Sequence, residues 1–354
     1  MNNNRYEEMT YITNIVKKHI VNALTTNVND MPVGLVSNFM YLYEQRFQVD
    51  VWLRPYVCAM LLKQYGYLYK SNIEINVDII PILVASELFN ISTYQSNIVF
   101  DDKINNKSVN NVNQIISSFI SFNLTTQVIS SLNIDHQIKV DCINKLNQNN
   151  RLVYQGQYID LNVLVTDNID SIVKMSIEKY LELYMNRCKL IGGTTVENCA
   201  FWVCKIAHKD MHYIDRLCTL FSKWGQMMQM VNDLSDYIYI LDKKYIRYTD
   251  VRAGKVTLPL YMILHSVSKD EAINIINHIP LQNDNDLNSI FEKYLYKDSA
   301  IIRYIYGVMK QIWNECVMLA NDLQLDKSII SFMYENAFQT KYSRFFFSNK
   351  LIRK

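Results

Sequence analysis

The chain has 354 residues, of which 49% are hydrophobic and 20% charged, and its formal net charge is +2. This balance supplies enough apolar material for a sizeable core and excludes a largely disordered protein. Glycine occurs 8 times and proline 5 times, so the turn residues that a many-stranded β protein needs are scarce. The small net charge indicates no particular partner, and in the absence of a basic arm or a zinc-finger spacing we expect no nucleic-acid binding.

Apolar residues recur at three- and four-residue spacing along most of the chain, for example in LRPYVCAMLLKQYGYLY from Leu53 and FWVCKIAHKDMHYIDRLCTLF from Phe201. That period predicts helices, and we find no sustained strand-like alternation. Pro55 and Pro81 each stand just ahead of an apolar periodic segment. Because proline is tolerated in the first turn of a helix, both predict helix starts.

We therefore expect one all-α domain over residues 1–354, with 1–30 as an N-terminal extension or helix. The seven cysteines form no CxxC pair and are typical of buried thiols in a reducing cytoplasm. The longest apolar runs, such as IIPILVASELF, are shorter than the roughly 20 residues that cross a bilayer, so we expect no membrane span.

Two acidic clusters follow apolar segments. In NIVFDDKINNKS, Asp101 and Asn105 share a helix face, with Asp102 beside them. In GQMMQMVNDLSDY, spacings of three and four residues place one polar stripe on a Met-rich helix, made of Gln229, Asn232, Asp233 and Asp236. Carboxylates at the edge of a core repel one another unless a cation neutralises them, and oxygen-rich clusters suit Mg²⁺.

Several lysines lie near or between the acidic clusters, as a diphosphate bridged by metal ions would need: Lys189, Lys244 and Lys255. Asp250 and Lys255 belong to DVRAGKVTLP. In this order the two segments resemble the second half of the trans-isoprenyl diphosphate synthase (polyprenyl synthetase) family, in which a Q-x-x-D-D-x-x-D helix precedes a D-x-x-x-G-K-x-T-L-P segment.

Other motifs occur in the order of that family. LRP at 53–55 resembles the end of its G-K-R-x-R-P segment, DDKIN at 101–105 its first aspartate-rich motif, and GQYIDL at 156–161 its G-Q-x-x-D-L. Lys189 stands where the lysine of the family's K-T pair is expected. The resemblance implies an all-α isoprenoid-synthase-type bundle around a deep apolar cavity, a prenyl diphosphate substrate and a homodimer.

The resemblance also implies roles for individual residues. Two or three Mg²⁺ ions would hold an allylic diphosphate and draw charge onto the leaving pyrophosphate, with these ligands: Asp101, Asp102, Asn105, Asn232, Asp233 and Asp236. The four aspartates of this set would be catalytic. Residues implied to bind the substrate diphosphate are Arg54, Lys189, Gln229, Lys244 and Lys255. Residues implied to line a pocket for a C15 or C20 chain are Ser96, Asn97, Phe100 and Gln157.

The sequence departs from the family at the site for a second diphosphate. The stretch DVWLRP has Val51 and Trp52 in place of the basic pair, so that only Arg54 remains. Asn105 and Asn232 each replace a carboxylate. Losing cations from an anion site weakens diphosphate binding, which favours a terpene synthase that ionises one prenyl diphosphate and then cyclises it or captures water.

Three alternatives stay open. The first is a prenyltransferase with a peptide or aromatic acceptor, the second an ordinary chain-elongating synthase with a rebuilt site, and the third a non-catalytic partner subunit. The basic and aromatic tail at 341–354 could be a lid whose Lys341 or Arg344 reaches the diphosphate. Its other interpretation is a last helix docked by Phe345–Phe347.

Overall fold

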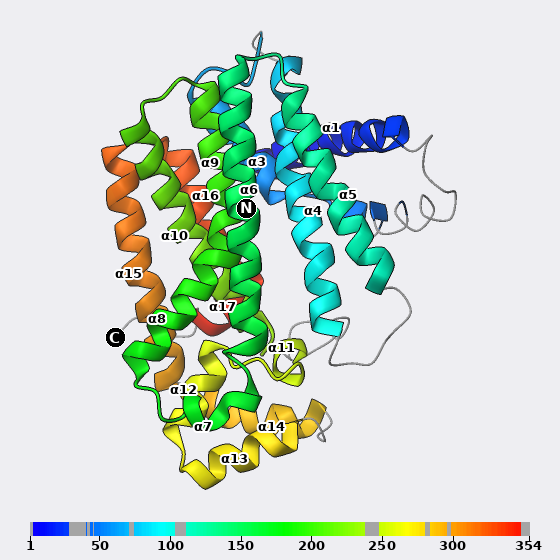
Figure 1. The fold of residues 1–354 in the computed structure, drawn as a ribbon. Helices are drawn as coiled ribbons and strands as arrows, with labels where there is room; N and C mark the ends of the chain where they lie inside the picture. Colours follow the sequence, from blue (N-terminus) through cyan, green and yellow to red (C-terminus); the bar gives the residue numbers. More distant parts are fainter. Residues whose placement is uncertain are drawn as a thin grey trace. The chain divides into compact units, whose positions relative to one another are not determined.

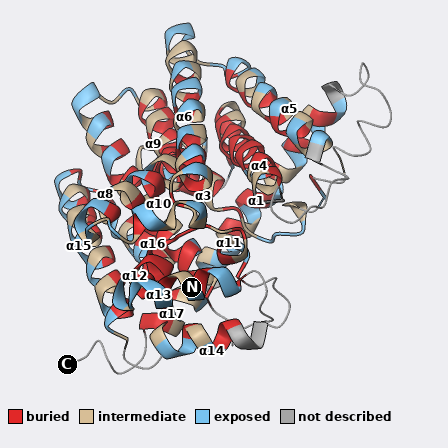
Figure 2. Cartoon of the chain, turned by 60° about the horizontal axis from the view of Figure 1, so that its bottom comes forward, coloured by how far each residue is buried: buried red, intermediate tan, exposed pale blue. Residues whose placement is uncertain are grey.

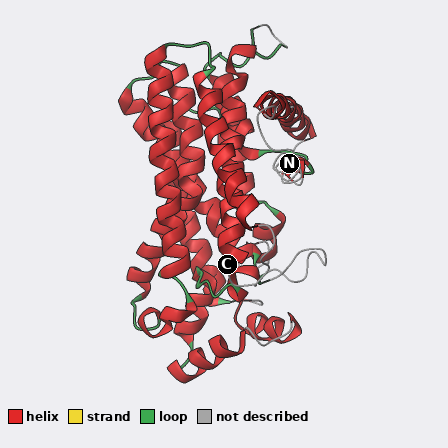
Figure 3. Cartoon of the chain, turned by 45° about the vertical axis from the view of Figure 1, so that its right-hand side comes forward, coloured by secondary structure: helices red, strands yellow, loops and turns green. Residues whose placement is uncertain are grey.

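The computed structural model describes residues 3–27, 40, 43–44, 46–70, 74–102, 111–237, 248–279, 284–295 and 299–347. The described residues form helices joined by short turns (Figure 3) and, outside two isolated bridges, pair into no strand. The all-α prediction is confirmed. The chain divides into two compact units, one made of 1–151, 194–221 and 323–329 and the other of 152–193, 222–322 and 330–354.

The first unit is built on long helices (Figure 1). Its elements are α1 (Asn3–Asn27), α3 (Leu53–Gln64), the 3-10 turn η1 (Val77–Ile79), α4 (Ile80–Asp102), α5 (Asn111–Ser130), the first part of α6 (His136–Asn162), α9 (Thr194–Ile206), the first part of α10 (Met211–Ser235) and the start of α16 (Lys327–Phe338).

The second unit holds the remaining parts of α6, α10 and α16 together with shorter helices. These are η2 (Thr166–Asn168), α7 (Ile169–Ile172), α8 (Ile177–Cys188), the π-helical turn η3 (Lys189–Gly193), α11 (Thr249–Arg252), α12 (Leu258–Ser266), α13 (Lys269–His278), α14 (Asp284–Leu295), α15 (Ala300–Asp322) and α17 (Lys341–Phe347).

Helices α3 and α4 form the core of the first unit. Pro55 and Pro81 lie in the first turns of these helices, as the sequence predicts. All residues of α3 from Pro55 to Leu62 are buried, and Figure 2 shows buried residues around most of α4 as well. The segment Val77–Phe100 is long and apolar enough to cross a membrane, but 78% of its most apolar stretch is buried inside the protein, as in the core helix of a globular fold.

Glycines allow close contact between helices in the second unit. A Cβ atom added to Gly192 in η3 would lie 2.4 Å from the backbone oxygen of Gly225 in α10, and one added to Gly225 would lie 2.5 Å from the oxygen of Gly192. A Cβ added to Gly156 of α6 would lie 2.7 Å from Ile191 Cγ1. A Cβ added to Gly193 of η3 would lie 2.8 Å from the backbone oxygen of Ser222 in α10. In a chain with only eight glycines, four therefore stand where α6, η3 and α10 leave no space for a side chain.

The C-terminal helix α17 is docked by its aromatic residues. Phe346 and Phe347 are buried, and Phe347 contacts the rings of Tyr306 and Phe338 at centroid distances of 5.1 and 6.4 Å. Lys341 and Arg344 lie on the exposed side. The docked-helix interpretation describes 341–347 well, whereas the rest of the tail, 348–354, lies outside the described residues.

We predict that Gly225→Ala lowers the free energy of unfolding by about 1–3 kcal/mol, because the new methyl group meets backbone atoms that cannot move aside. Urea unfolding followed by circular dichroism measures this. Gly307→Ala in α15 is the matched control, since no atom lies within 4 Å of its added Cβ, and it should be neutral or stabilising by up to about 1 kcal/mol. Equal stability of the two variants would contradict a tight contact at Gly225.

Candidate active site

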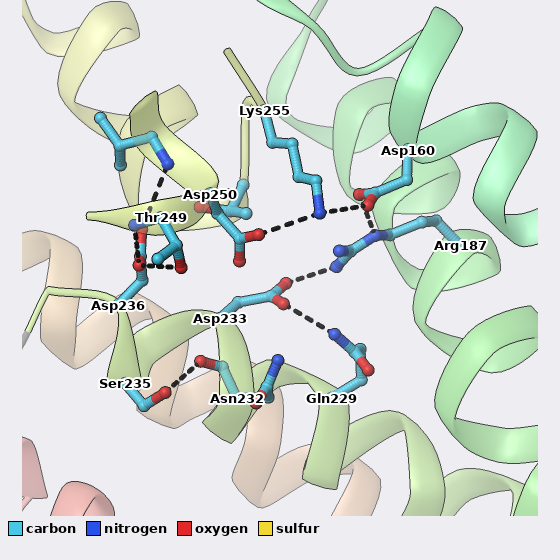
Figure 4. Close-up of polar contacts among 12 residues, drawn as sticks. Asp160, Arg187, Gln229, Asn232, Asp233, Ser235, Asp236, Thr249, Asp250 and Lys255 are labelled. Atoms are coloured by element: carbon cyan, nitrogen blue, oxygen red, sulfur yellow. Dashed lines mark hydrogen bonds and ion pairs between the residues drawn. The ribbon is translucent and has the colours of Figure 1, made fainter. Parts of the chain in front are cut away.

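The second acidic cluster lies at the C-terminal end of α10 (Figure 4). Gln229, Asn232 and Asp233 belong to the helix, and Asp236 follows it in a turn. Asn232 is exposed, whereas Asp233 is fully buried. The predicted polar stripe therefore divides into one side chain that faces solvent and one that lies in the protein interior.

Both carboxylate oxygens of Asp233 have hydrogen-bond partners. Gln229 Nε2 donates to Oδ1 at 2.9 Å. The hydroxyl of Tyr184 and Nη1 of Arg187 donate to Oδ2 at 2.7 and 2.5 Å. Tyr184 and Arg187 both come from α8, so α8 fixes the position of this carboxylate on α10.

Arg187 continues this contact into a chain of buried charges (Figure 4). Its Nε donates to Asp160 Oδ1 at 2.7 Å. Lys255 Nζ lies 3.1 Å from Asp160 Oδ2 and 3.0 Å from Asp250 Oδ1. The network thus alternates in sign from Asp250 through Lys255, Asp160 and Arg187 to Asp233, with three acids against two bases.

The surroundings shift the acidity of these carboxyl groups in opposite directions. Burial favours the neutral form of Asp160, but the charges of Arg187 and Lys255 outweigh it and hold the pKa of Asp160 below its ordinary value. Burial raises the pKa of Asp233, the charge of Arg187 opposes this, and the like charges of Asp250 and Asp160 add to the rise. The network has one more acidic than basic group, and the rise in pKa places this unbalanced negative charge near Asp233 at the end of α10.

Asp236 holds the segment that follows the undescribed residues 238–247. Its Oδ1 accepts the backbone N–H of Thr249 at 2.6 Å and the Thr249 hydroxyl at 3.0 Å, and its Oδ2 accepts the N–H of Val251 at 3.2 Å. These are N–H groups of the short helix α11, which begins after Tyr248 in the left-handed region at φ 54°. Burial and the like charge of Asp250 raise the pKa of Asp236 to about 7.

The DVRAGKVTLP segment adopts a defined turn. Gly254 has φ 72°, a conformation that suits glycine, and its carbonyl accepts the N–H of Thr166 at 2.8 Å. Lys255 then forms an isolated bridge with Val165. Pro259 lies in the first turn of α12. The turn carries the Lys255 ammonium group inward, where its side chain is 6% exposed.

The remaining residues of the sequence prediction are distributed over both units. Lys189 is exposed at the start of η3, and Gln157 is buried in α6. Ser96 is buried in α4, Asn97 and Phe100 are half-buried there, and the backbone of Asp101 and Asp102 completes this helix, although their side chains are not described. Asn105 and Lys244 lie outside the described residues.

In the first unit, the segment that departs from the family pattern leads into α3. Trp52 is fully buried, and its ring packs against Phe47 at a centroid distance of 5.6 Å. Arg54 is half-buried at the start of α3 and donates to the hydroxyl of Thr195 at 3.4 Å. A core tryptophan therefore occupies the position where the resemblance expects a cation.

Sequence reasoning missed Arg187, Tyr184 and the partner role of Asp160. Arg187 precedes Lys189 by two residues and reads as an ordinary charge near the end of a helix. Asp160 lies in GQYIDL, so the motif contained the available signal. A buried acid in one helix and a buried base in another become recognisable as partners only when the fold brings them together.

The donors of the second acidic cluster fit a magnesium ion in part. Both oxygens of Asp233 are engaged, whereas Asp236 Oδ2 accepts a single hydrogen bond and has a lone pair left, and the Asn232 amide is exposed. Within the described residues, no three His, Cys, Asp or Glu side chains gather as a metal-binding group. The role of Asp101 and Asp102 as ligands stays a prediction.

We predict that Arg187→Met lowers the free energy of unfolding by about 3–5 kcal/mol, because it leaves the buried carboxylate of Asp233 without a cation and that of Asp160 with Lys255 alone. The matched control is Lys223→Met on α10, where the pair with Glu315 at 2.6 Å is about one-third exposed and should contribute at most about 1 kcal/mol. Urea unfolding of both variants tests this. If Arg187→Met is no less stable than the control, the buried network does not hold the helices together.

Comparisons with known proteins agree on one family. A family model described as polyprenyl synthetase matches residues 101–297, which include both acidic clusters and the DVRAGKVTLP segment. No curated protein sequence matches the chain.

Solved structures of the same fold are numerous. Geranylgeranyl pyrophosphate synthase from Corynebacterium glutamicum, complexed with isoprenyl diphosphate and magnesium, matches with a TM-score of 0.73 at 13% identity over 95% of this chain and 99% of that one. Decaprenyl diphosphate synthase from Rhodobacter capsulatus matches with a TM-score of 0.72 at 12% identity over 96% and 99%. Geranylgeranyl pyrophosphate synthase from Lactobacillus brevis matches with a TM-score of 0.67 at 14% identity over 92% and 95%.

At these identities the structural likeness shows the fold. The family match covers more than half of the chain and contains the segments whose charges form the network around Arg187 and Lys255. The chain belongs to the polyprenyl synthetase family and is an enzyme that acts on allylic diphosphates.

Proposed function

We propose that this enzyme is a prenyltransferase, which ionises an allylic prenyl diphosphate and transfers the prenyl group to a second substrate. The family match over residues 101–297 carries the proposal. The similar structures named above are of prenyl diphosphate synthases, which supports transfer over the cyclisation that the sequence alone favours. A C15 or C20 donor fits the modest size of Ser96 and Asn97 in α4.

We propose that some residues of the two acidic clusters bind the metal ions, whereas Asp233 positions a helix. Bound Mg²⁺, as two or three ions, supplies the positive charge that stabilises the departing diphosphate. Asp101, Asp102 and Asn105 are proposed ligands of the first motif, and Asn232 and Asp236 of the second. Asp233 is proposed to act chiefly by holding α10 in place, because Arg187, Tyr184 and Gln229 occupy its oxygens.

The basic residues divide in the same way. Lys189 is exposed and is proposed to contact the substrate diphosphate, as are Gln229 and Lys244. Lys255 is paired with two carboxylates, so we propose that it orients Asp160 and Asp250 and adds positive charge near the diphosphate.

A terpene synthase is the second candidate. The observation that favours it is the burial of Trp52 in the core of the first unit, because a buried indole cannot supply the positive charge that a second diphosphate needs. The prenyltransferase requires a second substrate to form product and release pyrophosphate. The terpene synthase requires none.

We also propose a homodimer in the cytoplasm. Helix α5 carries exposed apolar side chains one turn apart, Val112, Ile115 and Phe119, and a patch of this kind suits a second copy of the chain. All seven cysteines are free and buried, which suits a reducing compartment.

The proposed function predicts that farnesyl or geranylgeranyl diphosphate with Mg²⁺ gives a prenylated product only when an acceptor is added. The acceptors to compare are isopentenyl diphosphate and a tryptophan-containing peptide, with products separated by chromatography and identified by mass spectrometry. Asp101→Asn with Asp102→Asn should abolish product. A hydrocarbon or alcohol formed at the full rate without any acceptor would instead establish the terpene synthase.

The raised pKa of Asp236 predicts a pH-dependent rate. Because only the ionised carboxylate binds Mg²⁺, and its pKa is about 7, activity should rise from pH 6 to pH 8 and fall about tenfold per pH unit well below the pKa. Asp236→Asn should be weakly active and lack this rise. A wild-type profile that is flat over this range would contradict the role of Asp236.

The same group affects stability without magnesium. Between an unfolded value near 3.9 and about 7, the folded state binds a proton that the unfolded state releases. The free energy of unfolding, measured in EDTA, should therefore fall by up to about 4 kcal/mol as pH rises through this window. Asp236→Asn should lose that slope.

A further inference from the structure

Three buried polar atoms lie around the start of α3 and the middle of α4 in the first unit. They are Nε1 of Trp52, Nε of Arg54 and Oε2 of Glu87, and none of them has a hydrogen-bond partner in the structure. Glu87 and Trp52 are fully buried. We call these three residues the α3–α4 polar cluster.

Arg46 connects the members of this cluster. Its Nε and Nη2 donate to Glu87 Oε1 at 2.9 and 2.7 Å, and its guanidinium lies 5.7 Å from the centre of the Trp52 ring. Asn90 Nδ2 donates to the same Oε1 at 3.0 Å. Three N–H groups therefore converge on one carboxylate oxygen, while the other oxygen of Glu87 accepts none.

The guanidinium of Arg54 also has N–H groups that are not satisfied, because its Nε lacks a hydrogen-bond partner. Its bond to Thr195 at 3.4 Å is long, and a guanidinium has five N–H groups to satisfy. Burial lowers the pKa of Arg54, and the charge of Glu87 partly opposes this, so the two side chains lie within electrostatic range of each other. Leaving a buried polar atom without a hydrogen bond destabilises the folded protein by more than an ordinary hydrogen bond stabilises it. We therefore expect a bound group to satisfy the polar atoms of this cluster.

The hydrogen-bond donors and acceptors of the cluster indicate which chemical group would fit it. Trp52 and Arg54 offer N–H donors, and Glu87 offers an acceptor, so a matching group must both accept and donate hydrogen bonds. A carboxamide does both. A diphosphate has acceptors only, and the buried carboxylate of Glu87, which already pairs with Arg46, repels its negative charge.

We propose that the α3–α4 polar cluster is a binding site for an uncharged carboxamide group. Resting on the proposed prenyltransferase function, we assign this amide to the prenyl acceptor, as a recognition group and not as the atom that receives the prenyl chain. The second substrate would then be peptide-like or amide-bearing, in place of a second diphosphate.

Soaked crystals of the full-length protein test the site directly, with acetamide as the uncharged probe and isopentenyl diphosphate as the anionic one. We expect acetamide to place its N–H on Glu87 Oε2 and its oxygen on Nε of Arg54 or Nε1 of Trp52. The proposal is overturned if the diphosphate occupies the cluster, if only water occupies it in both soaks, or if Arg54 closes onto Glu87.

Glu87→Gln tests the same contact in solution. Arg46 and Asn90 require an oxygen, so the glutamine amide would direct its NH₂ group toward the probe and repel the acetamide N–H. The dissociation constant of acetamide, measured by titration in NMR, should rise about tenfold or more. The matched control is Glu197→Gln, whose carboxylate pairs with Lys145 outside the cluster, and it should leave the constant unchanged.

Trp52→Phe provides a second variant that keeps an aromatic side chain and removes the N–H donor, and it too should weaken acetamide binding. Unchanged binding in both Glu87→Gln and Trp52→Phe would overturn the site. Neither the soak nor the titration depends on turnover. If acetamide binds as expected but no acceptor is ever prenylated, the site stands and the prenyltransferase proposal fails.

Discussion

The arrangement of the candidate active site depends on one buried guanidinium. Arg187, 3% exposed in its side chain, holds Asp160 of α6 with Nε and Asp233 of α10 with Nη1. A buried arginine is tolerable only when its donors are matched by acceptors, and the planar fork presents them in fixed directions. The guanidinium therefore sets the distance between two helices as well as their charge. Any change that moves α6 or α10 must break a charge-assisted bond in a dry interior.

This constraint works because glycine permits the helices to approach. Gly192 of η3 and Gly225 of α10 have no space for a side chain between them, and Gly225 lies two turns before Asp233 on the same helix. The close contact at one point and the ion pair at the other together fix the axis and the rotation of α10. Rotation decides which of two adjacent residues faces inward. Here Asp233 is inside and Asn232 is at the surface.

Much of this fold could be predicted from the sequence because its signals are local. Pro55, Pro81 and Pro259 lie in first turns of helices, since proline fixes its own φ wherever the chain places it. The stripe from Gln229 to Asp236 follows from helical spacing alone. Periodicity cannot distinguish Asn232 from Asp233, however, because both lie near the edge of the apolar face. It also cannot pair Arg187 with Asp160, 27 positions apart, since that contact exists only after the helices have packed.

The sequence departs from the family pattern at the end of α10 and at the start of α3, and the two departures have different physical consequences. At the end of α10, Asn232 lies at an exposed position where the family pattern has a carboxylate, and its amide oxygen can still serve as the proposed cation ligand. At the start of α3, Trp52 replaces a cation at a fully buried position, and no rearrangement of its side chain can restore the lost charge. The guanidinium of Arg46 lies 5.7 Å from the Trp52 ring but is paired with the buried carboxylate of Glu87, so it does not replace the lost charge. In the proposed prenyltransferase, donor recognition and acceptor recognition can therefore diverge separately, and the change at α3 falls on the proposed acceptor site.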